Sequence, residues 1–310
     1  MQRIDIVAPR LADLGRKRTT GPVAFGVGCN GTVLVATCAT AEPLRIERRG
    51  ASFPKTQLDR PAPYDVLRIA EGSVERVALG DERLIVSYVQ PHPDGALLVG
   101  ARCQWRPSGA DQNAVIRGWD GSIVRRMTLG DGISDVRVTP DGTIWCGYFD
   151  EGVLGSFGWG AGGAPPIGAP GIVAFDRFGR VKRTYDPVAA GTGSICDVYA
   201  LNVAGDDDVW ACCYEDFPIV HLDAERARSW ELGIAAHALA VRGARALLAG
   251  TDGRRDTLRE IVLGEADTRT RAKGTLVGQG GASLARASII GVGDALYAFD
   301  GRRVFGTREW

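Results

Sequence analysis

The sequence predicts an all-β protein, a six-bladed β-propeller built from four-stranded blades. One apolar hairpin unit recurs along the 310 residues, and amphipathic helical periodicity is scarce. Repeats of about 40 to 50 residues, each containing four strands, are typical of propellers. A strand-like segment near the N-terminus belongs to no hairpin, and we expect it to supply the missing strand of the last blade.

The repeated unit is an apolar strand, a tight polar turn and a second short apolar strand. Its clearest copies span residues 89–100 and 136–147, where they turn at Asp94-Gly95 and Asp141-Gly142. These dipeptides favour two-residue hairpin turns. Weaker copies span residues 23–36, 198–212, 239–250 and 289–299. Six copies predict six blades.

A second hairpin follows most copies, at residues 66–79, 115–129, 172–185, 219–232 and 258–276. The sixth blade has residues for three strands but not for a fourth. The segment Arg3–Ala8, in which apolar and polar residues alternate, has no strand to pair with. Pairing the two would remove exposed sheet edges. We therefore predict one domain with blades at 22–79, 83–129, 133–186, 195–232, 236–276 and 284–310, the last completed by residues 3–8, which closes the ring.

Composition excludes several functional classes. Lys plus Arg and Asp plus Glu number 37 each, so the formal net charge is zero and no general attraction to nucleic acid is expected. No apolar run is long enough to cross a membrane, and the N-terminus lacks the apolar core of a secretory signal. We expect a cytoplasmic protein with no nucleic-acid or membrane partner. Its seven cysteines lack Cys-x-x-Cys spacing and are predicted to be free, buried thiols.

One repeat resembles those of a known group of proteins. Residues Pro140 to Gly147 read Pro-Asp-Gly-Thr-Ile-Trp-Cys-Gly and follow Ser134-Asp135-Val136. This pattern resembles six-bladed propellers of the gluconolactonase, strictosidine-synthase-like and NHL group, as an architecture. Metal-dependent lactonases of that group hold a divalent cation with Glu, Asn and Asp side chains, and Asp135 and Asp197 match in position. The expected first-blade Glu is absent, because Pro-Val-Ala-Phe stands at residues 22–25.

Repeat alignment predicts which side chains meet on one rim. In a propeller, the starts of the first strands and the loops from second to third strand lie on the same face. First-strand starts hold Tyr88, Asp135, Asp197 and, one residue out of register, His237. The segments after the second strands hold Arg102, Trp105, Asp150, Glu151 and Glu215. Long connections at residues 40–65, 102–113 and 150–171, the last containing Trp159, are expected to form a wall around this face.

These residue types permit two kinds of chemistry. Clustered carboxylates suit a hard divalent cation such as Ca or Mg. Asp135 and Asp197 have a structural alternative, in which they bond backbone amides of the adjacent blade. Of the three histidines, His237 is the candidate general base, whereas His92 is expected to be exposed and His221 to pack in a third strand. Trp145 and Trp210 share a repeat position with leucines, so we predict that they pack in the core.

Two functional hypotheses follow. In the first, the protein binds a polar small molecule, a peptide or a protein through Tyr88, Arg102, Trp105, Trp159, Asp150 and Glu151. In the second, it is a divalent-metal-dependent hydrolase or lyase, lactonase-like, with Asp135 and Asp197 as metal ligands and His237 or Glu215 as the base. A scaffold that docks a protein on another face is a third possibility. Since propellers support many unrelated activities, the fold does not choose among these.

Overall fold

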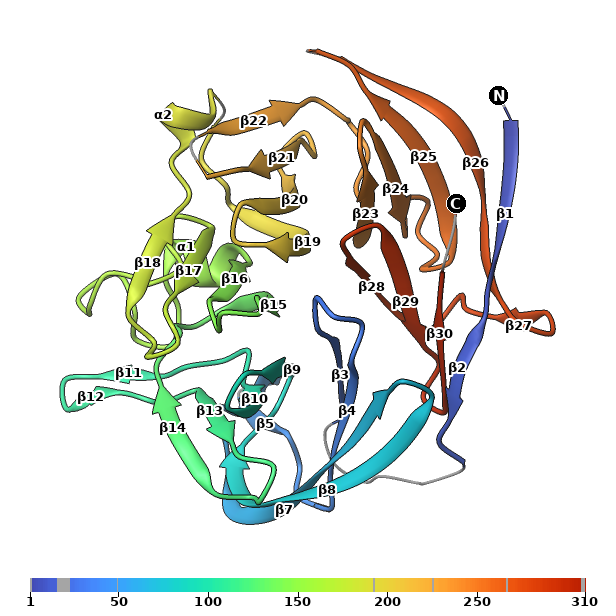
Figure 1. The fold of residues 1–310 in the computed structure, drawn as a ribbon. Helices are drawn as coiled ribbons and strands as arrows, with labels where there is room; N and C mark the ends of the chain where they lie inside the picture. Colours follow the sequence, from blue (N-terminus) through green and yellow to red (C-terminus); the bar gives the residue numbers. More distant parts are fainter. Residues whose placement is uncertain are drawn as a thin grey trace. The chain divides into compact units, whose positions relative to one another are not determined.

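Six β-sheets, each built around four antiparallel strands, follow one another along the chain, as the repeats predict (Figure 1). They are the blades of a six-bladed β-propeller. The computed structural model describes residues 2–15, 23–48, 50–191, 193–224, 226–265, 267–307 and 310. The chain divides into an N-terminal unit, residues 18–185, and a C-terminal unit, residues 186–310 together with 1–17. Pro22, the predicted start of blade one, lies outside the described residues.

The N-terminal unit contains blades one, two and three. Blade one is formed by β3 (Val23–Val27), β4 (Val33–Cys38), β7 (Gln57–Ala70) and β8 (Ser73–Leu84). Blade two is formed by β9 (Tyr88–His92), β10 (Gly95–Val99), β13 (Ala114–Arg117) and β14 (Ile123–Met127). Blade three is formed by β15 (Ile133–Val138), β16 (Ile144–Tyr148), β17 (Ile172–Phe175) and β18 (Val181–Thr184).

The long connections of this unit contain structure of their own. They hold the hairpin β5 (Arg45–Arg48) and β6 (Ala51–Pro54), the hairpin β11 (Trp105–Arg106) and β12 (Gly109–Ala110), and helix α1 (Asp150–Leu154). Strand β7 begins at Gln57, so much of the predicted connection at residues 40–65 is strand. Blade one correspondingly ends at Leu84, beyond the predicted end at Leu79.

The C-terminal unit contains blades four, five and six. Blade four is formed by β19 (Asp197–Gly205), β20 (Asp208–Tyr214), β21 (Ile219–Leu222) and β22 (Ala227–Trp230), and helix α2 (Pro187–Ala190) precedes it. Blade five is formed by β23 (Ala238–Arg242), β24 (Arg245–Ala249), β25 (Thr257–Leu263) and β26 (Thr268–Gly278), with the short β27 (Ala282–Ser283) paired to β26. Blade six contains β28 (Ser288–Val292), β29 (Ala295–Phe299) and β30 (Arg303–Gly306).

An N-terminal strand completes blade six, as predicted, but it is not the predicted segment. Strand β2 (Arg10–Asp13) pairs antiparallel with β30. Strand β1 (Gln2–Ala8), which contains the predicted residues 3–8, instead pairs in parallel with β26 as an additional outer strand of blade five. The approach is so close that a Cβ atom on Gly274 would lie 1.3 Å from the carbonyl oxygen of Ile4. Alternation marked β1 as a strand, but alternation does not specify which sheet a strand joins.

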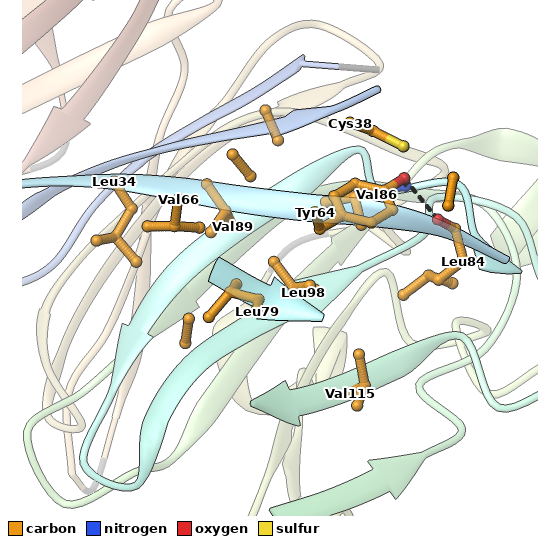
Figure 2. Packing of buried hydrophobic residues seen from close by; sticks show 14 of the residues in the cluster. Leu34, Cys38, Tyr64, Val66, Leu79, Leu84, Val86, Val89, Leu98 and Val115 are labelled. Carbon is orange, nitrogen blue, oxygen red and sulfur yellow. Dashed lines mark hydrogen bonds between the residues drawn. The ribbon is translucent and has the colours of Figure 1, made fainter. Parts of the chain in front are cut away.

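Apolar side chains on neighbouring sheets form the cores of each unit. Figure 2 shows the cluster in which Leu34 and Val66 of blade one pack with Val89 and Leu98 of blade two. The hydroxyl of Tyr64 in this cluster donates a 2.7 Å hydrogen bond to the carbonyl oxygen of Leu84. Trp145 is fully buried in blade three, as its repeat position predicts. Burying such side chains is the main source of stability in a sheet stack.

None of the helices in the described part of the chain is long and apolar enough to cross a membrane.

Candidate functional site

Arg102, one of the six predicted binding residues of the N-terminal unit, pairs with two carboxylates, one of which is the predicted residue Glu151. Its guanidinium donates two hydrogen bonds to the buried carboxylate of Asp131, at 3.0 and 2.8 Å. A further N–H pairs with Glu151 of α1, and the ring of Phe157 lies 4.2 Å from the guanidinium carbon. Burial raises the pKa of Asp131, although the Cys103 amide and Arg102 act in the opposite direction. Arg102 thus fastens two long loops together, and its charge is already balanced by the protein.

Trp105 and Trp159 belong to the same pair of loops. The amide of Trp105 donates a 2.9 Å hydrogen bond to the carbonyl oxygen of Phe157. The indole N–H of Trp159 donates a 2.8 Å hydrogen bond to the carbonyl oxygen of Cys103, and the residue is 8% exposed. These two hydrogen bonds join the loop that follows β10 to the loop that follows β16. That the long loops form a wall around a binding face stays a prediction.

The two loop acids lie at the start of α1. Both Asp150 and Glu151 are in its first turn, where acidic side chains are favourable. The carboxylate of Asp150 accepts a hydrogen bond from the amide of Glu151 at 2.7 Å. Of the two, Glu151 joins the Arg102 network, and Asp150 does not.

Tyr88 and Asp135 lie on the adjacent first strands β9 and β15. The Tyr88 hydroxyl donates to the carbonyl oxygen of Ile133 at 2.9 Å, and burial, followed by the Asp135 charge, raises its pKa. Asp135 accepts two hydrogen bonds from the guanidinium of Arg137, at 2.7 and 3.1 Å. Its carboxylate also accepts from the amide of Val136. Intramolecular partners therefore engage the polar groups of both residues.

In the C-terminal unit, the predicted rim positions of blades four and five contain an aromatic cluster: Tyr199, Tyr214, Phe217 and His237. The Tyr199 ring stacks on His237, with centroids 5.7 Å apart and planes inclined by 5°. Tyr199 also stacks on Tyr214 at 6.3 Å and meets Phe217 at 5.4 Å. The Tyr214 and His237 side chains are exposed, whereas Tyr199 and Phe217 are half-buried. These four rings form a surface that is open to solvent.

Local backbone irregularities create the cluster. The register between β19 and β20 shifts between Val198 and Ala200, so Tyr199 is the extra residue of a β-bulge. Such bulges re-aim a side chain. Asp216 and Phe217, which follow β20, have φ of 63° and 52°. This left-handed region is unfavourable for a bulky residue, and such strain is often found at functional sites. The Asp216 carbonyl oxygen accepts from the Gly233 amide at 3.0 Å, which holds the connection in place.

His237 and Glu215, the two alternative predicted bases, lie in the segments that form this cluster. His237 precedes β23, and a Cβ atom on Gly250 would lie 3.1 Å from its ring, so the imidazole rests against that glycine. Partial burial, followed by the charge of Arg255, lowers the pKa of His237. Its imidazole is therefore neutral at neutral pH. Glu215 is exposed and directly follows Tyr214 in the chain.

Asp197, the second predicted metal ligand, begins β19 opposite Tyr214. Its charge adds to burial in raising the pKa of the Cys213 thiol. Within the described residues, no three His, Cys, Asp or Glu side chains are grouped so as to hold a metal ion. All seven cysteines are free thiols, as predicted, but Cys29 and Cys196 are only half-buried.

The other two histidines, His92 and His221, both pack against neighbouring residues. His92 was expected to be exposed, but its side chain is fully buried. Its Nδ1 accepts a 3.1 Å hydrogen bond from the amide of Asp94, which folds the ring inward beside Gly142. Burial lowers its pKa. His221 lies in β21 and stacks on Trp210 with a centroid distance of 3.9 Å, so it packs as predicted.

Sequence reasoning identified one of the four cluster residues, His237, and missed Tyr199, Tyr214 and Phe217. The available signal was the density of aromatic residues around Glu215, since Tyr214 and Phe217 flank the acidic pair Glu215 and Asp216. If side chains alternated regularly from Val198 onward, Tyr199 would not point toward Tyr214 and Phe217. The β-bulge at Tyr199 turns its side chain toward these two rings, and the repeat pattern does not show this bulge.

No protein-family model matches the sequence, and no curated protein matches it. Among solved structures, a streptogramin B lyase is similar with a TM-score of 0.49 and 8% identity, over 96% of this chain and 87% of that one. YCF48 bound to a D1 peptide has a TM-score of 0.42 and 11% identity, over 100% and 96% of the two chains. A gluconolactonase from Xanthomonas campestris has a TM-score of 0.41 and 11% identity, over 96% and 98%. The six-bladed architecture itself is established by the sheet topology of this chain.

Proposed function

We propose that this protein is a binding protein and that the aromatic cluster of its C-terminal unit contacts the ligand. The observation that carries the proposal is the parallel stack of Tyr199 and His237, extended by Tyr214 and left open to solvent. Aromatic faces of this kind are common in binding sites, because they offer large contact areas at a low entropic cost.

Two acidic side chains beside the cluster, Glu215 and Asp216, favour a ligand with a positively charged group. Among the described residues, the one positive charge that acts on His237 is that of Arg255. Ring faces attract organic cations, and Glu215 and Asp216 add two exposed carboxylates in the connection after β20. The lowered pKa of His237 keeps its imidazole neutral at neutral pH, so the imidazole does not repel a cation. The proposed ligand is therefore a small molecule or a peptide that presents an ammonium or guanidinium group.

The predicted alternative, a metal-dependent hydrolase or lyase, has less support. Asp135 is paired with Arg137, and no group of three metal-ligating side chains occurs in the part of the chain that the structure describes. His237 and Glu215 are then ligand-contacting residues, rather than the base of a hydrolytic site.

Calorimetric titration tests the proposal with two cations and their uncharged isosteres. Choline is compared with 3,3-dimethylbutan-1-ol, and acetyl-arginine amide with acetyl-citrulline amide. Since a cation–π contact contributes about 0.5 to 2 kcal/mol, each cation is expected to bind roughly 2- to 30-fold more tightly than its isostere.

Substitutions locate the binding surface. Tyr199→Leu and Tyr214→Leu should abolish the preference for the cation. The matched control is Phe178→Leu, which removes an exposed ring from the N-terminal unit and should change nothing. Equal affinities for cation and isostere, or a preference that survives Tyr199→Leu, would contradict the proposal.

A further inference from the structure

A second concave surface lies between blades four and five, and it shares no residue with the aromatic cluster. It is a groove of about 650 Å³, within the range of small-molecule sites. One wall comes from β20, β21 and β22, and the other from the β23–β24 turn and the end of β25. Its lining includes Trp210, His221, Arg228, Trp230, Gly264 and Glu265.

The floor of the groove is a stack of aromatic rings. Trp210, His221 and Arg228 are direct cross-strand neighbours on β20, β21 and β22. The Trp210 ring lies 3.9 Å from the His221 ring and 5.7 Å from the Trp230 ring, with both pairs nearly parallel. Trp210 and Trp230 belong to the core between the blades but keep 7% and 6% of their surface exposed. The stacked rings of the core thus reach the surface at this groove.

Hydrogen bonds fix the rings before any ligand arrives. One carboxylate oxygen of Asp208 accepts from the indole N–H of Trp210 at 2.6 Å and lies 3.0 Å from Nε2 of His221. The indole N–H of Trp230 donates to the carbonyl oxygen of Gly264 at 2.9 Å, across the groove. A floor held in this way loses little conformational entropy when a flat ring packs on it.

Arg228 supplies an available positive charge beside the floor. Its side chain is exposed, and it forms no hydrogen bond or ion pair with the described residues. By contrast, Arg245 and Arg271 in the neighbouring blade are both paired with the buried Glu260. Glu265 is the acid of the opposite wall, and it disfavours a negative group on that side. On the wall formed by blade four, the Asp208 carboxylate is engaged by Trp210 and His221, so a ligand anion is directed toward Arg228.

We infer that this groove binds a small planar ring that carries a carboxylate. The ring packs on the stack of Trp210, His221 and Trp230, and the carboxylate accepts charge-assisted hydrogen bonds from Arg228. This inference does not rest on the proposed function, since the aromatic cluster and the groove have different residues and opposite charge preferences.

Calorimetric titration of the full chain with three indoles tests the inference. Indole-3-acetate, indole and tryptamine carry an anionic, a neutral and a cationic group on the same ring. We expect indole-3-acetate to bind most tightly and tryptamine least. Arg228→Gln should weaken binding of indole-3-acetate about tenfold or more, because it removes hydrogen bonds from a charged donor.

Two control variants keep the result specific. Arg226→Gln removes an exposed arginine two residues away that does not line the groove, and it should leave the affinity unchanged. Tyr199→Leu should also leave it unchanged, which separates this site from the aromatic cluster. No binding of indole-3-acetate, tighter binding of tryptamine, or an Arg228→Gln variant with unaltered affinity would overturn the inference.

Discussion

Tyr199 and His237 stack with their ring planes inclined by 5°, although one belongs to blade four and the other precedes blade five. The contact depends on the bulge that re-aims Tyr199 and on Gly250, which leaves room for the imidazole. Phe217, at φ 52°, completes the group from the connection after β20. Two neighbouring blades thus build one aromatic surface.

The left-handed residues beside this surface can be tested by their backbone preferences. Asp216 has a φ of 63°, which glycine adopts freely and a β-branched residue resists. Asp216→Gly should therefore change the free energy of unfolding by less than about 0.5 kcal/mol, whereas Asp216→Val should lower it by about 1 to 2 kcal/mol. Urea unfolding of both variants measures the difference. Equal stabilities would show that the connection does not hold this conformation in solution.

The outer strand β1 depends on the absence of a side chain at Gly274. A methyl group there would collide with the carbonyl oxygen of Ile4, so Gly274→Ala should detach β1 and cost about 3 kcal/mol. Hydrogen exchange should then become fast at the amides of residues 2–8. Gly205→Ala is the control, because a Cβ atom at Gly205 meets nothing within 4 Å. Unchanged protection of β1 in Gly274→Ala would refute the parallel pairing.

Trp145 tests the packing of the blades. Its side chain is fully buried between sheets, so Trp145→Ala should lower the free energy of unfolding by about 3 to 5 kcal/mol. Trp119 is 36% exposed, and Trp119→Ala should cost far less. Thermal unfolding of the two variants provides the comparison. A Trp145→Ala protein as stable as Trp119→Ala would mean that the register of blade three is wrong.

His92 makes stability depend on pH. Burial lowers its pKa in the folded state, so the unfolded chain binds more protons below its ordinary pKa of about 6.5. The folded state is therefore stabilised above that pH and loses stability as the pH falls toward the folded-state pKa.

His92→Asn removes this titration and keeps an acceptor for the Asp94 amide. The decline in unfolding free energy between about pH 7 and pH 5 should then be shallower. Part of the decline in unfolding free energy should remain in the variant, because the pKa of His237 is also lowered. An identical pH profile for the two proteins would rule out a contribution from His92.

The fold was predictable because its signals are local. Asp94-Gly95 and Asp141-Gly142 mark hairpin turns, and the apolar strands between them recur at blade spacing. The partner of the segment Arg3–Ala8 was not predictable, since parallel pairing with β26 depends on the close approach to Gly274, which no local pattern shows.

The predicted ligand-binding residues all lie in the N-terminal unit, whereas the aromatic cluster lies in the C-terminal unit and includes only His237 among the predicted site residues. Repeat alignment located the rim segments that contain His237 and Glu215. It also located Arg102, but it could not show that Asp131, Glu151 and Phe157 surround its guanidinium. Those contacts depend on how two long loops fold onto each other, and the repeats contain no information about loop packing.

The most direct test of the central claim is to observe the aromatic cluster while a cation binds. In protein labelled with ¹³C in its tyrosine rings, Tyr199→Phe and Tyr214→Phe assign the two resonances. Addition of choline should shift both, because the cation lies over their ring faces, and 3,3-dimethylbutan-1-ol should shift them much less. Unmoved Tyr199 and Tyr214 resonances at saturating choline, or equal shifts with the uncharged isostere, would contradict the account.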